Sequence, residues 1–399
     1  MSQTTPRLNC ALIVHLNQET ANDKKSVQEG IHLLANIAHQ CELPISWALL
    51  PTLANSYKKE LTNYCTEFND DIVLALDTNH LDKVDLNRAD QIVTSRNKLF
   101  THISKEKDRL QKIFPDGHLH TASTTGTINH ILVEALESTG FYALAGYHAG
   151  GKDIGCPFDF FYPSEERHNF ANQPQRSVVG IPTTDCLVEM VLEGRCHEYL
   201  DRHLYNLNFG HQLNANSSLV FTADITRVAN CVGSQLDLLT EFLARLSQKK
   251  IINIQPLGHL VDDFRTTNPT ITPPTCFLDQ SRLFYYDDNC HLIFDSSQTE
   301  PVEIYNYISP PIGSLDGKET EIPPIIDFKS SRSRLELRMS IEIESAKNMP
   351  FGFAIWGDHI GLKLMETDAL SVTWIDRQLL LVRVDLCYGQ NKFYIRLTI

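Results

Sequence analysis

The sequence predicts an α/β protein in which a (β/α) barrel at residues 8–264 is followed by an all-β sandwich domain at residues 275–399. Two observations support this fold class. Up to residue 264, short apolar segments alternate with amphipathic helical segments, which is typical of parallel strands joined by helices. Beyond residue 275, short alternating segments follow one another with no comparable helix between them, which indicates antiparallel sheets.

The strands of the barrel are expected where short apolar runs stop at polar residues. The first, Cys10–Val14, ends at His15, and the helix after it carries Val27, Ile31 and Leu34 at helical spacing. Further strands are predicted at 43–50, 71–76, 119–123, 141–145, 178–182, 218–222 and 251–256, and further helices at 57–68, 86–114, 128–139, 197–207, 236–248 and 257–264. Six or more strand–helix units in one run favour closure into a barrel, and a doubly wound open sheet is the alternative.

The segment 146–174 is too long for a simple connection and is rich in Gly, Pro and aromatic residues. Loops of this length are usually functional or disordered, and the density of aromatic side chains argues against disorder. Two interpretations stay open. The aromatic residues of 155–163 can pack as the core of a folded-over lid. Alternatively Phe158, Phe161 and Tyr162 form a platform for a sugar ring, and Asp159 accepts hydrogen bonds from its hydroxyls.

Residues 265–274 contain Pro and Thr in place of the earlier pattern and are expected to form a linker. The strands after it are predicted at 282–286, 292–294, 302–308, 335–343, 352–355, 360–365, 370–374, 379–384 and 393–397. With Trp356 and Trp374, this second domain can serve as a carbohydrate-binding module or as an inert support.

Composition excludes several classes of protein. The net charge of −14 argues against nucleic acid and anionic membranes as main partners. No apolar run reaches the roughly 20 residues that span a bilayer, and the N-terminus lacks the pattern of a signal peptide. The ten cysteines are scattered singly, which favours buried thiols in a reducing compartment. We therefore expect a cytoplasmic protein, and its oligomeric state is left open.

Polar residues follow three of the predicted strands at the point where each strand ends. They are His15, Asn17 and Glu19 after the first strand, Asp77 and His80 after the third, and Asp224 after the strand at 218–222. Because parallel strands of a barrel end on the same face, we expect His15, Glu19, His80 and Asp224 to converge at one mouth, under the loop 155–163.

The order of these segments resembles that of the polysaccharide deacetylase-like (β/α)7 barrels over about Leu8 to Phe264. The resemblance rests on ALIVHLNQET with LPISWALLP, on DIVLALDTNH, on HTASTTGTINHILVEALESTGF and on SLVFTAD with its following helix. It implies a divergent carbohydrate-active hydrolase that cleaves a C–N or glycosidic bond in an acylated or glycosidic substrate, with its active site at the carboxyl ends of the strands.

The motifs of that family are altered in this chain. The family binds a divalent metal through an Asp of the first strand and two His of the second motif, and a second first-strand Asp acts as base. Here His15, Asn17 and Glu19 occupy the first-strand positions, and of the two His only the second is matched, by His80. Asp224 stands near the place where a catalytic His is usual. The usual zinc-dependent apparatus is therefore absent in its standard form.

Three interpretations of the mouth follow. A divalent metal such as Zn, bound by His15, His80 and His120, would polarise an acyl carbonyl and activate water. Alternatively, carboxylates hydrolyse the substrate without a metal, as glycosidases do. The carboxylate candidates are Glu19, Asp77 and Asp224, with Asp159 and Asp185 as further ones, and Asn17 would help to bind the substrate.

The third interpretation is a catalytically silent binding or scaffold protein, since several expected residues are lost together. A stoichiometric metal in the purified protein would favour the enzyme. Carboxylates at strand ends are also common helix caps. If Glu19 and Asp224 are functional, replacing either with Ala is expected to abolish ligand binding and to leave thermal stability nearly unchanged or raised.

Overall fold

The computed structural model describes residues 7–16, 23–78, 81, 89–115, 117, 119–149, 153, 155–171, 173–209, 216–286, 291–295, 297, 306–312, 322–357, 361–376 and 378–399. The chain divides into two compact units, the first made of Met1–Tyr205 with Asn216–Pro273 and the second of Asn206–Ala215 with Pro274–Ile399. The expected limits of independently folding domains, 8–264 and 275–399, stay a prediction.

The first unit is built on a parallel sheet, which confirms the α/β class. Its strands follow the order β6-β5-β4-β3-β2-β1-β7, and β8 pairs with the amino-terminal half of β1. The strands are β1 (Arg7–Leu16), β2 (Ser46–Leu49), β3 (Asp71–Ala75), β4 (Thr121–Ser123), β5 (Ala143–Tyr147), β6 (Val179–Pro182), β7 (Asn216–Asp224) and β8 (Ile252–Ile254). Each lies within a few residues of a strand predicted from the sequence.

The sheet curves until its two ends come together. Strand β1 pairs with β7 along its whole length, and His15 lies opposite Asp224 in this register. At the other end, the residues that follow β6 pair with β7: Thr184 N donates to Val220 O at 3.0 Å, and Cys186 forms a bridge with Thr222. The arrangement is that of a barrel, not of an open sheet with β1 and β7 at opposite edges.

Part of the long loop fills the remaining gap between β6 and β7. Phe161 and Gly180 of β6 exchange two backbone hydrogen bonds, with N–O distances of 3.1 and 2.6 Å. Two residues earlier, Asp159 is hydrogen-bonded to Ser218 of β7. The segment 159–161 thus contacts both strands at the seam, nearer to their amino ends than the bridge at Cys186.

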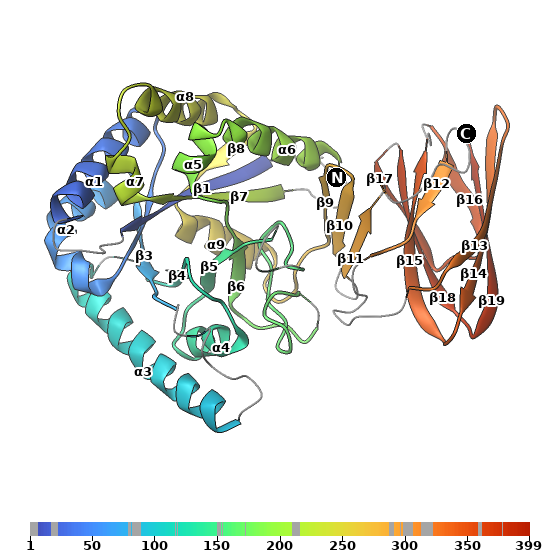
Figure 1. The fold of residues 1–399 in the computed structure, drawn as a ribbon, viewed down its shortest axis with the longest axis horizontal. Coiled ribbons are helices and arrows are strands. Elements are labelled where there is room, and N and C mark those ends of the chain that lie inside the picture. Colours follow the sequence, from blue (N-terminus) through green and yellow to red (C-terminus); the bar gives the residue numbers. More distant parts are fainter. Residues whose placement is uncertain are drawn as a thin grey trace. The chain divides into compact units, whose positions relative to one another are not determined.

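Helices surround these strands (Figure 1). They are α1 (Asp23–Gln40), α2 (Pro51–Glu67), α3 (Ala89–Ile113), α4 (His130–Ser138), α5 (Leu187–Leu192), α6 (Arg195–Phe209), α7 (Ile225–Ala229), α8 (Ser234–Gln248) and α9 (Leu257–Thr267). The sequence did not predict α5 and α7, which are too short to show a helical period. Gly30 lets α1 approach α7 closely, since a Cβ atom there would lie 2.5 Å from Ile225 O.

Small and β-branched side chains fill the interior of the barrel, where alternate residues of each strand point inward. They include Ala11, Ile13, Ala48, Val73, Ala75, Ala143, Ala145, Val179, Ile181 and Val220. Helix α9 packs into the same core through Leu257, Leu260 and Val261. Because Ser46 Oγ and Asp71 Oδ2 accept from Leu257 N and Gly258 N, both at 2.8 Å, the amino terminus of α9 is fixed at the amino ends of β2 and β3. Helix α9 therefore closes the amino end of the barrel.

The second unit consists of antiparallel sheets, which confirms a β-rich region after the barrel. Two four-stranded sheets have the orders β12-β15-β18-β17 and β13-β14-β19-β16, and a third has the order β11-β10-β9. The strands are β9 (Thr275–Asp279), β10 (Arg282–Tyr286), β11 (His291–Asp295), β12 (Asn306–Ser309), β13 (Ile325–Arg332), β14 (Glu336–Ser345), β15 (Met349–Gly357), β16 (Lys363–Thr367), β17 (Ser371–Asp376), β18 (Leu379–Leu386) and β19 (Gly389–Thr398). Side chains of all three sheets share one core.

Two general expectations can be compared with this fold. Within the described ranges, none of the helices has the length and apolar character needed to cross a bilayer. The nine cysteines that the structure describes are all free, but the expectation of buried thiols holds for five of them, since Cys387 is exposed and Cys41, Cys65 and Cys186 are only partly buried.

Candidate active site at the mouth of the barrel

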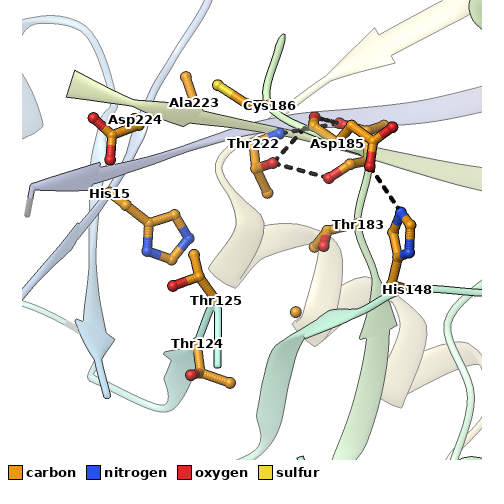
Figure 2. A pocket seen from close by; sticks show the side chains of 12 residues that line it. His15, Thr124, Thr125, His148, Thr183, Asp185, Cys186, Thr222, Ala223 and Asp224 are labelled. Atoms are coloured by element: carbon orange, nitrogen blue, oxygen red, sulfur yellow. Dashed lines mark hydrogen bonds and ion pairs between the residues drawn. The ribbon is translucent and has the colours of Figure 1, made fainter. Parts of the chain in front are cut away.

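A cavity of about 370 Å³ opens at the carboxyl ends of β1, β4, β5, β6 and β7. Figure 2 shows the side chains around it. Its lining consists of His15, Thr124, Thr125, Gly146, His148, Thr183, Thr184, Asp185, Cys186, Thr222, Ala223 and Asp224. The cavity thus lies where strand topology places the active sites of (β/α) barrels.

His15 reaches the cavity because it continues the inward-facing series Ala11 and Ile13 of β1. Its side chain is 4% exposed, and Nε2 lies 3.2 Å from Ser123 Oγ of β4. Burial lowers the pKa of His15 to about 4, although the charge of Asp224 opposes this shift. The imidazole is therefore neutral at pH 7 and can donate one hydrogen bond and accept another.

Asp224 ends β7 and also caps the short helix α7. Its Oδ1 accepts from Thr226 N at 2.9 Å, from Thr226 Oγ1 at 2.5 Å and from Arg227 N at 3.3 Å. These donors fix the orientation of the carboxylate at the cavity wall, close to His15. The sequence-based prediction that His15 and Asp224 meet at the mouth agrees with this geometry, and the alternative role as a helix cap applies to Asp224 at the same time.

Threonine hydroxyls make up much of the cavity wall: Thr124, Thr125, Thr183, Thr184 and Thr222. Several are held by the backbone at the seam, where Thr222 Oγ1 donates to Thr184 O at 3.0 Å. Gly146 allows β5 to approach β4, because its φ is +123° and a Cβ atom would lie 2.0 Å from Thr124 O. The wall is therefore held by the backbone, and it presents mainly hydroxyl lone pairs to the cavity.

A second polar group lies at the cavity rim. His148 Nε2 is 3.0 Å from Asp185 Oδ1, and the other carboxylate oxygen of Asp185 is 3.1 Å from Arg195 Nη1. The three side chains are 36%, 44% and 47% exposed, so solvent reaches them. Asp185 was among the further carboxylates considered from the sequence, whereas His148 and the threonines were not identified.

The sequence does indicate the residues that were missed, because they follow the carboxyl ends of two strands. The sequence ended the fifth strand at Ala145 and assigned the following residues to the loop, but β5 continues to Tyr147. His148 is therefore the first polar residue after β5. Thr183, Thr184 and Asp185 follow β6 in the same way.

Four predicted site residues are not placed with this group. Glu19, Asn17 and His80 lie outside the described residues. Asp77 is exposed shortly after β3 and is not among the residues that line the cavity.

His120 does not belong to the mouth, so its assignment as a metal ligand was wrong. It precedes β4, and its carbonyl accepts from Tyr142 N just before β5, at the amino ends of both strands. Its ring stacks on Tyr142 with centroids 4.3 Å apart, and Arg265 of α9, the helix that closes the amino end of the barrel, lies over the same Tyr142 ring.

The loop aromatics form packing contacts, which corrects the proposed sugar platform. Phe161 and Tyr162 are 0% and 1% exposed, so neither ring has a free face. Tyr162 also donates its hydroxyl to Asn268 O at 2.7 Å. Phe158 is only partly buried, but the platform would lack its other two members.

Asp159 is likewise unavailable to a substrate in the cavity. Its Oδ1 accepts from Phe160 N at 2.7 Å, and Ser218 supplies further hydrogen bonds. Burial raises the pKa of Asp159 to about 7 despite these donors. The carboxyl group is part of the seam between β6 and β7 and has a structural role.

The described residues do not fit a zinc site. Within the described ranges, no group of three or more His, Cys, Asp or Glu side chains could hold a metal ion. His15 and Asp224 are neighbours, but Asp224 Oδ1 is occupied by three donors of α7, and His120 is at the other end of β4. We therefore base the proposed chemistry of the cavity on its described side chains.

Comparison with known proteins gives no match to a family model and no match to a curated protein. Solved structures similar to this chain include a protein from Mycobacterium smegmatis classed as a polysaccharide deacetylase (11% identity, TM-score 0.48, 69% of this chain and 96% of that chain). A probable polysaccharide deacetylase from Pseudomonas aeruginosa PAO1 is 10% identical (TM-score 0.48, 66% and 93%). The 4-alpha-glucanotransferase from Thermococcus litoralis is 9% identical (TM-score 0.45, 99% and 100%).

The solved structures similar to this chain thus include polysaccharide deacetylases, the family that the sequence resembles. All three TM-scores are below 0.5, so the function has to be inferred from the residues of the cavity.

Proposed function

We propose that this chain is a carbohydrate-active hydrolase that binds a hydroxyl-rich substrate in the cavity at the mouth of the barrel and cleaves a C–N or glycosidic bond there. One observation carries the proposal: hydroxyl, imidazole and carboxylate groups from the ends of five strands line a single cavity of about 370 Å³. Ligand pockets usually measure roughly 300–1,000 Å³, so the volume is sufficient for a small ligand or one end of a larger one.

The character of the lining supports a neutral, hydroxyl-rich ligand. Among the described residues that line the cavity, none is Lys or Arg. The hydroxyls of Thr183, Thr184 and Thr222 donate to backbone carbonyl groups, so towards a ligand they offer acceptor lone pairs, which suit the hydroxyl donors of a sugar ring. The described part of the lining contains no Phe, Tyr or Trp, and we expect its polar groups to select the ligand through hydrogen bonds.

Asp224 and His15 are the groups proposed to act on the reacting bond. The orientation of Asp224 is fixed by α7, and its carboxylate can orient a water molecule or stabilise positive charge that develops on the substrate. The neutral imidazole of His15, held near Ser123, can hydrogen-bond a substrate oxygen without introducing a charge. Neither role requires a group from outside the cavity lining.

A silent binding or scaffold protein is the second candidate function. It is favoured by the involvement of Asp224 Oδ1 in capping α7, because a residue retained for that purpose would persist after activity was lost. It would bind a hydroxyl-rich ligand in the same cavity and leave it intact.

The two candidates differ in their products. The purified protein is incubated with tetra-N-acetylchitotetraose and with maltotetraose, while released acetate and new reducing ends are measured and binding is followed by calorimetry. The hydrolase predicts that one of these products forms and that Asp224→Asn abolishes it, since Asn still caps α7. Binding without any product favours the silent protein, and neither binding nor product contradicts both.

A further inference from the structure

The chain His148–Asp185–Arg195 at the rim of the cavity has no role in the proposal above. Each residue follows or precedes a different element: His148 follows β5, Asp185 follows β6 and Arg195 begins α6. The two contacts, of 3.0 and 3.1 Å, use different oxygens of the one carboxylate. Asp185 is thus held from both sides, and both His148 and Asp185 line the cavity.

Hydrogen-bond chemistry assigns the proton on the imidazole. A carboxylate only accepts, so Nε2 of His148 carries the hydrogen that Asp185 Oδ1 accepts. In the neutral ring the lone pair then lies on Nδ1. Within the described ranges, no residue is hydrogen-bonded to this nitrogen, and the side chain is 36% exposed.

The main chain of His148 is fixed as well. Its amide donates to Asp153 Oδ2 at 2.8 Å, and Asp153 is itself 5% exposed. Among the described residues, the charged and titratable groups around the imidazole are Asp185, Arg195 and Glu193 on the α5–α6 side, Asp153 in the loop, and His15, Cys186 and Asp224 elsewhere in the cavity lining.

Stability alone gives little reason for this arrangement. Ion pairs between side chains as exposed as these contribute little to stability, because solvent screens them and ordering the side chains costs entropy. A carboxylate that orients an imidazole and stabilises its cationic form is, by contrast, an effective way to build a proton acceptor.

We propose that His148 is the general base of the cavity, that Asp185 positions it, and that Arg195 holds Asp185. This inference rests on the proposed function. As a water molecule attacks an acyl carbon, its oxygen forms the new C–O bond, one proton passes to Nδ1 of His148, and the carbonyl electron pair moves to the oxygen. When the intermediate collapses, the bond to the leaving group breaks, and the leaving group takes the proton back from the imidazolium.

The test uses p-nitrophenyl acetate, an activated ester that reports a reactive general base without knowledge of the natural substrate. Initial rates are measured for the full chain between pH 5 and 8, the range in which imidazole groups change charge. The variants are His148→Gln, Asp185→Asn and Asp185→Glu. His102→Gln, which removes an exposed histidine of α3, is the control.

His148→Gln is expected to lower the rate about 100-fold, within the range known for general bases, and to remove its pH dependence. Asp185→Asn is expected to lower the rate at least tenfold, Asp185→Glu to restore most of it, and His102→Gln to match the wild type. A wild-type protein that hydrolyses the ester no faster than His148→Gln overturns the proposal. So does an Asp185→Asn variant with the wild-type rate and pH profile.

This result is distinguishable from the test of the proposed function. Hydrolysis of the ester that depends on His148, together with no product from the two oligosaccharides, would keep the base and reject the carbohydrate substrate. Product from an oligosaccharide with an unchanged rate in His148→Gln would keep the hydrolase and reject this base.

Discussion

The two ends of the barrel both contain buried polar side chains, but they use them differently. At the amino end, Asp71 accepts the amide of Gly258, and Asp159 is covered by Phe160 N and Ser218. At the carboxyl end, His15 and Asp224 face a cavity. At the start of the strands these carboxylates accept backbone amides of the protein, although Asp71 Oδ1 is buried without a partner among the described residues, whereas His15 and Asp224 at the end of the strands face a space that a ligand can enter.

The cause lies in how the chain covers each end. Helix α9 packs its apolar face into the amino end, and its free amide groups are capped by Ser46 and Asp71. At the carboxyl end, within the described ranges, the chain leaves a cavity between the ends of five strands. The comparison predicts that substitutions at the amino end change stability and those at the mouth change ligand binding.

The largest expected effect is at the amino end. Leu260→Ala should lower the free energy of unfolding by about 2–5 kcal/mol, because the removed side chain is 3% exposed and leaves a void in the barrel core. Urea denaturation measures this loss. The folded variant should bind the oligosaccharide probe as tightly as the wild type. A parallel loss of affinity would contradict the claim that the amino end determines stability and the mouth determines binding.

Asp159 should make the fold less stable as the pH rises from about 4 to about 7. Its pKa is raised to about 7 in the folded chain, so the folded state holds a proton that the unfolded state releases near pH 4. The stabilisation is therefore complete below pH 4 and is lost as the pH rises through 7, by roughly 2–4 kcal/mol. Relative to wild type, Asp159→Asn should become more stable between pH 5 and pH 8 in urea denaturation. Asp262→Asn, at an exposed position of α9, is the control and should follow the wild type.

His15 should act in the opposite direction at the mouth. Its pKa is lowered to about 4, so on acidification the unfolded state binds a proton near pH 6.5 and the folded state does not. The wild type should lose roughly 2–3 kcal/mol between pH 7 and pH 4, a loss that His15→Gln avoids. Equal pH slopes for both proteins in the same denaturation series would show that His15 is not buried as described.

Asp224 both caps α7 and faces the cavity, and substitutions can separate its structural role from its role in the reaction. The sequence led us to expect that Asp224→Ala leaves stability unchanged, but the cap on α7 predicts a loss of about 1 kcal/mol. Asp224→Asn keeps the cap and removes the charge, so its melting temperature should stay near that of the wild type while activity is lost. Retained activity in Asp224→Asn would make the residue a cap alone.

The smallest effect on stability is expected at the rim. His148→Gln and Asp185→Asn should each change the free energy of unfolding by less than about 1 kcal/mol, since both side chains are more than one-third exposed. Denaturation at pH 7 measures the change. A loss of several kcal/mol would mean that the rim contacts support the fold and would weaken their assignment to the reaction.

The sequence predicted the barrel because strand–helix alternation is a strong local signal, and it placed His15 and Asp224 together because parallel strands end on one face. The prediction of site residues failed where an error of one or two residues in a strand boundary changes which side chains reach the mouth. His120 was placed inside a strand that begins only at Thr121, so it lies at the amino end of β4, away from the mouth. His148 was missed because β5 is two residues longer than expected.

The aromatic loop 155–163 shows a second limit of prediction from sequence. A run such as Phe160, Phe161 and Tyr162 has the same composition whether it stacks on a sugar or packs against the barrel. What decides between the two is the gap between β6 and β7, which Phe161 enters by pairing with Gly180. That gap depends on contacts between residues far apart in the chain, and no local pattern contains them.

The central claim is that the cavity at the mouth of the barrel is the ligand site. Methyl-labelled threonine, observed by NMR during titration with tetra-N-acetylchitotetraose or maltotetraose, tests it most directly. We predict that the signals of Thr124, Thr125, Thr183, Thr184 and Thr222 shift with one of these sugars, while those of Thr367 and Thr373 in the second unit do not. Shifts confined to the second unit, or none in the five cavity threonines with either sugar, would contradict the account.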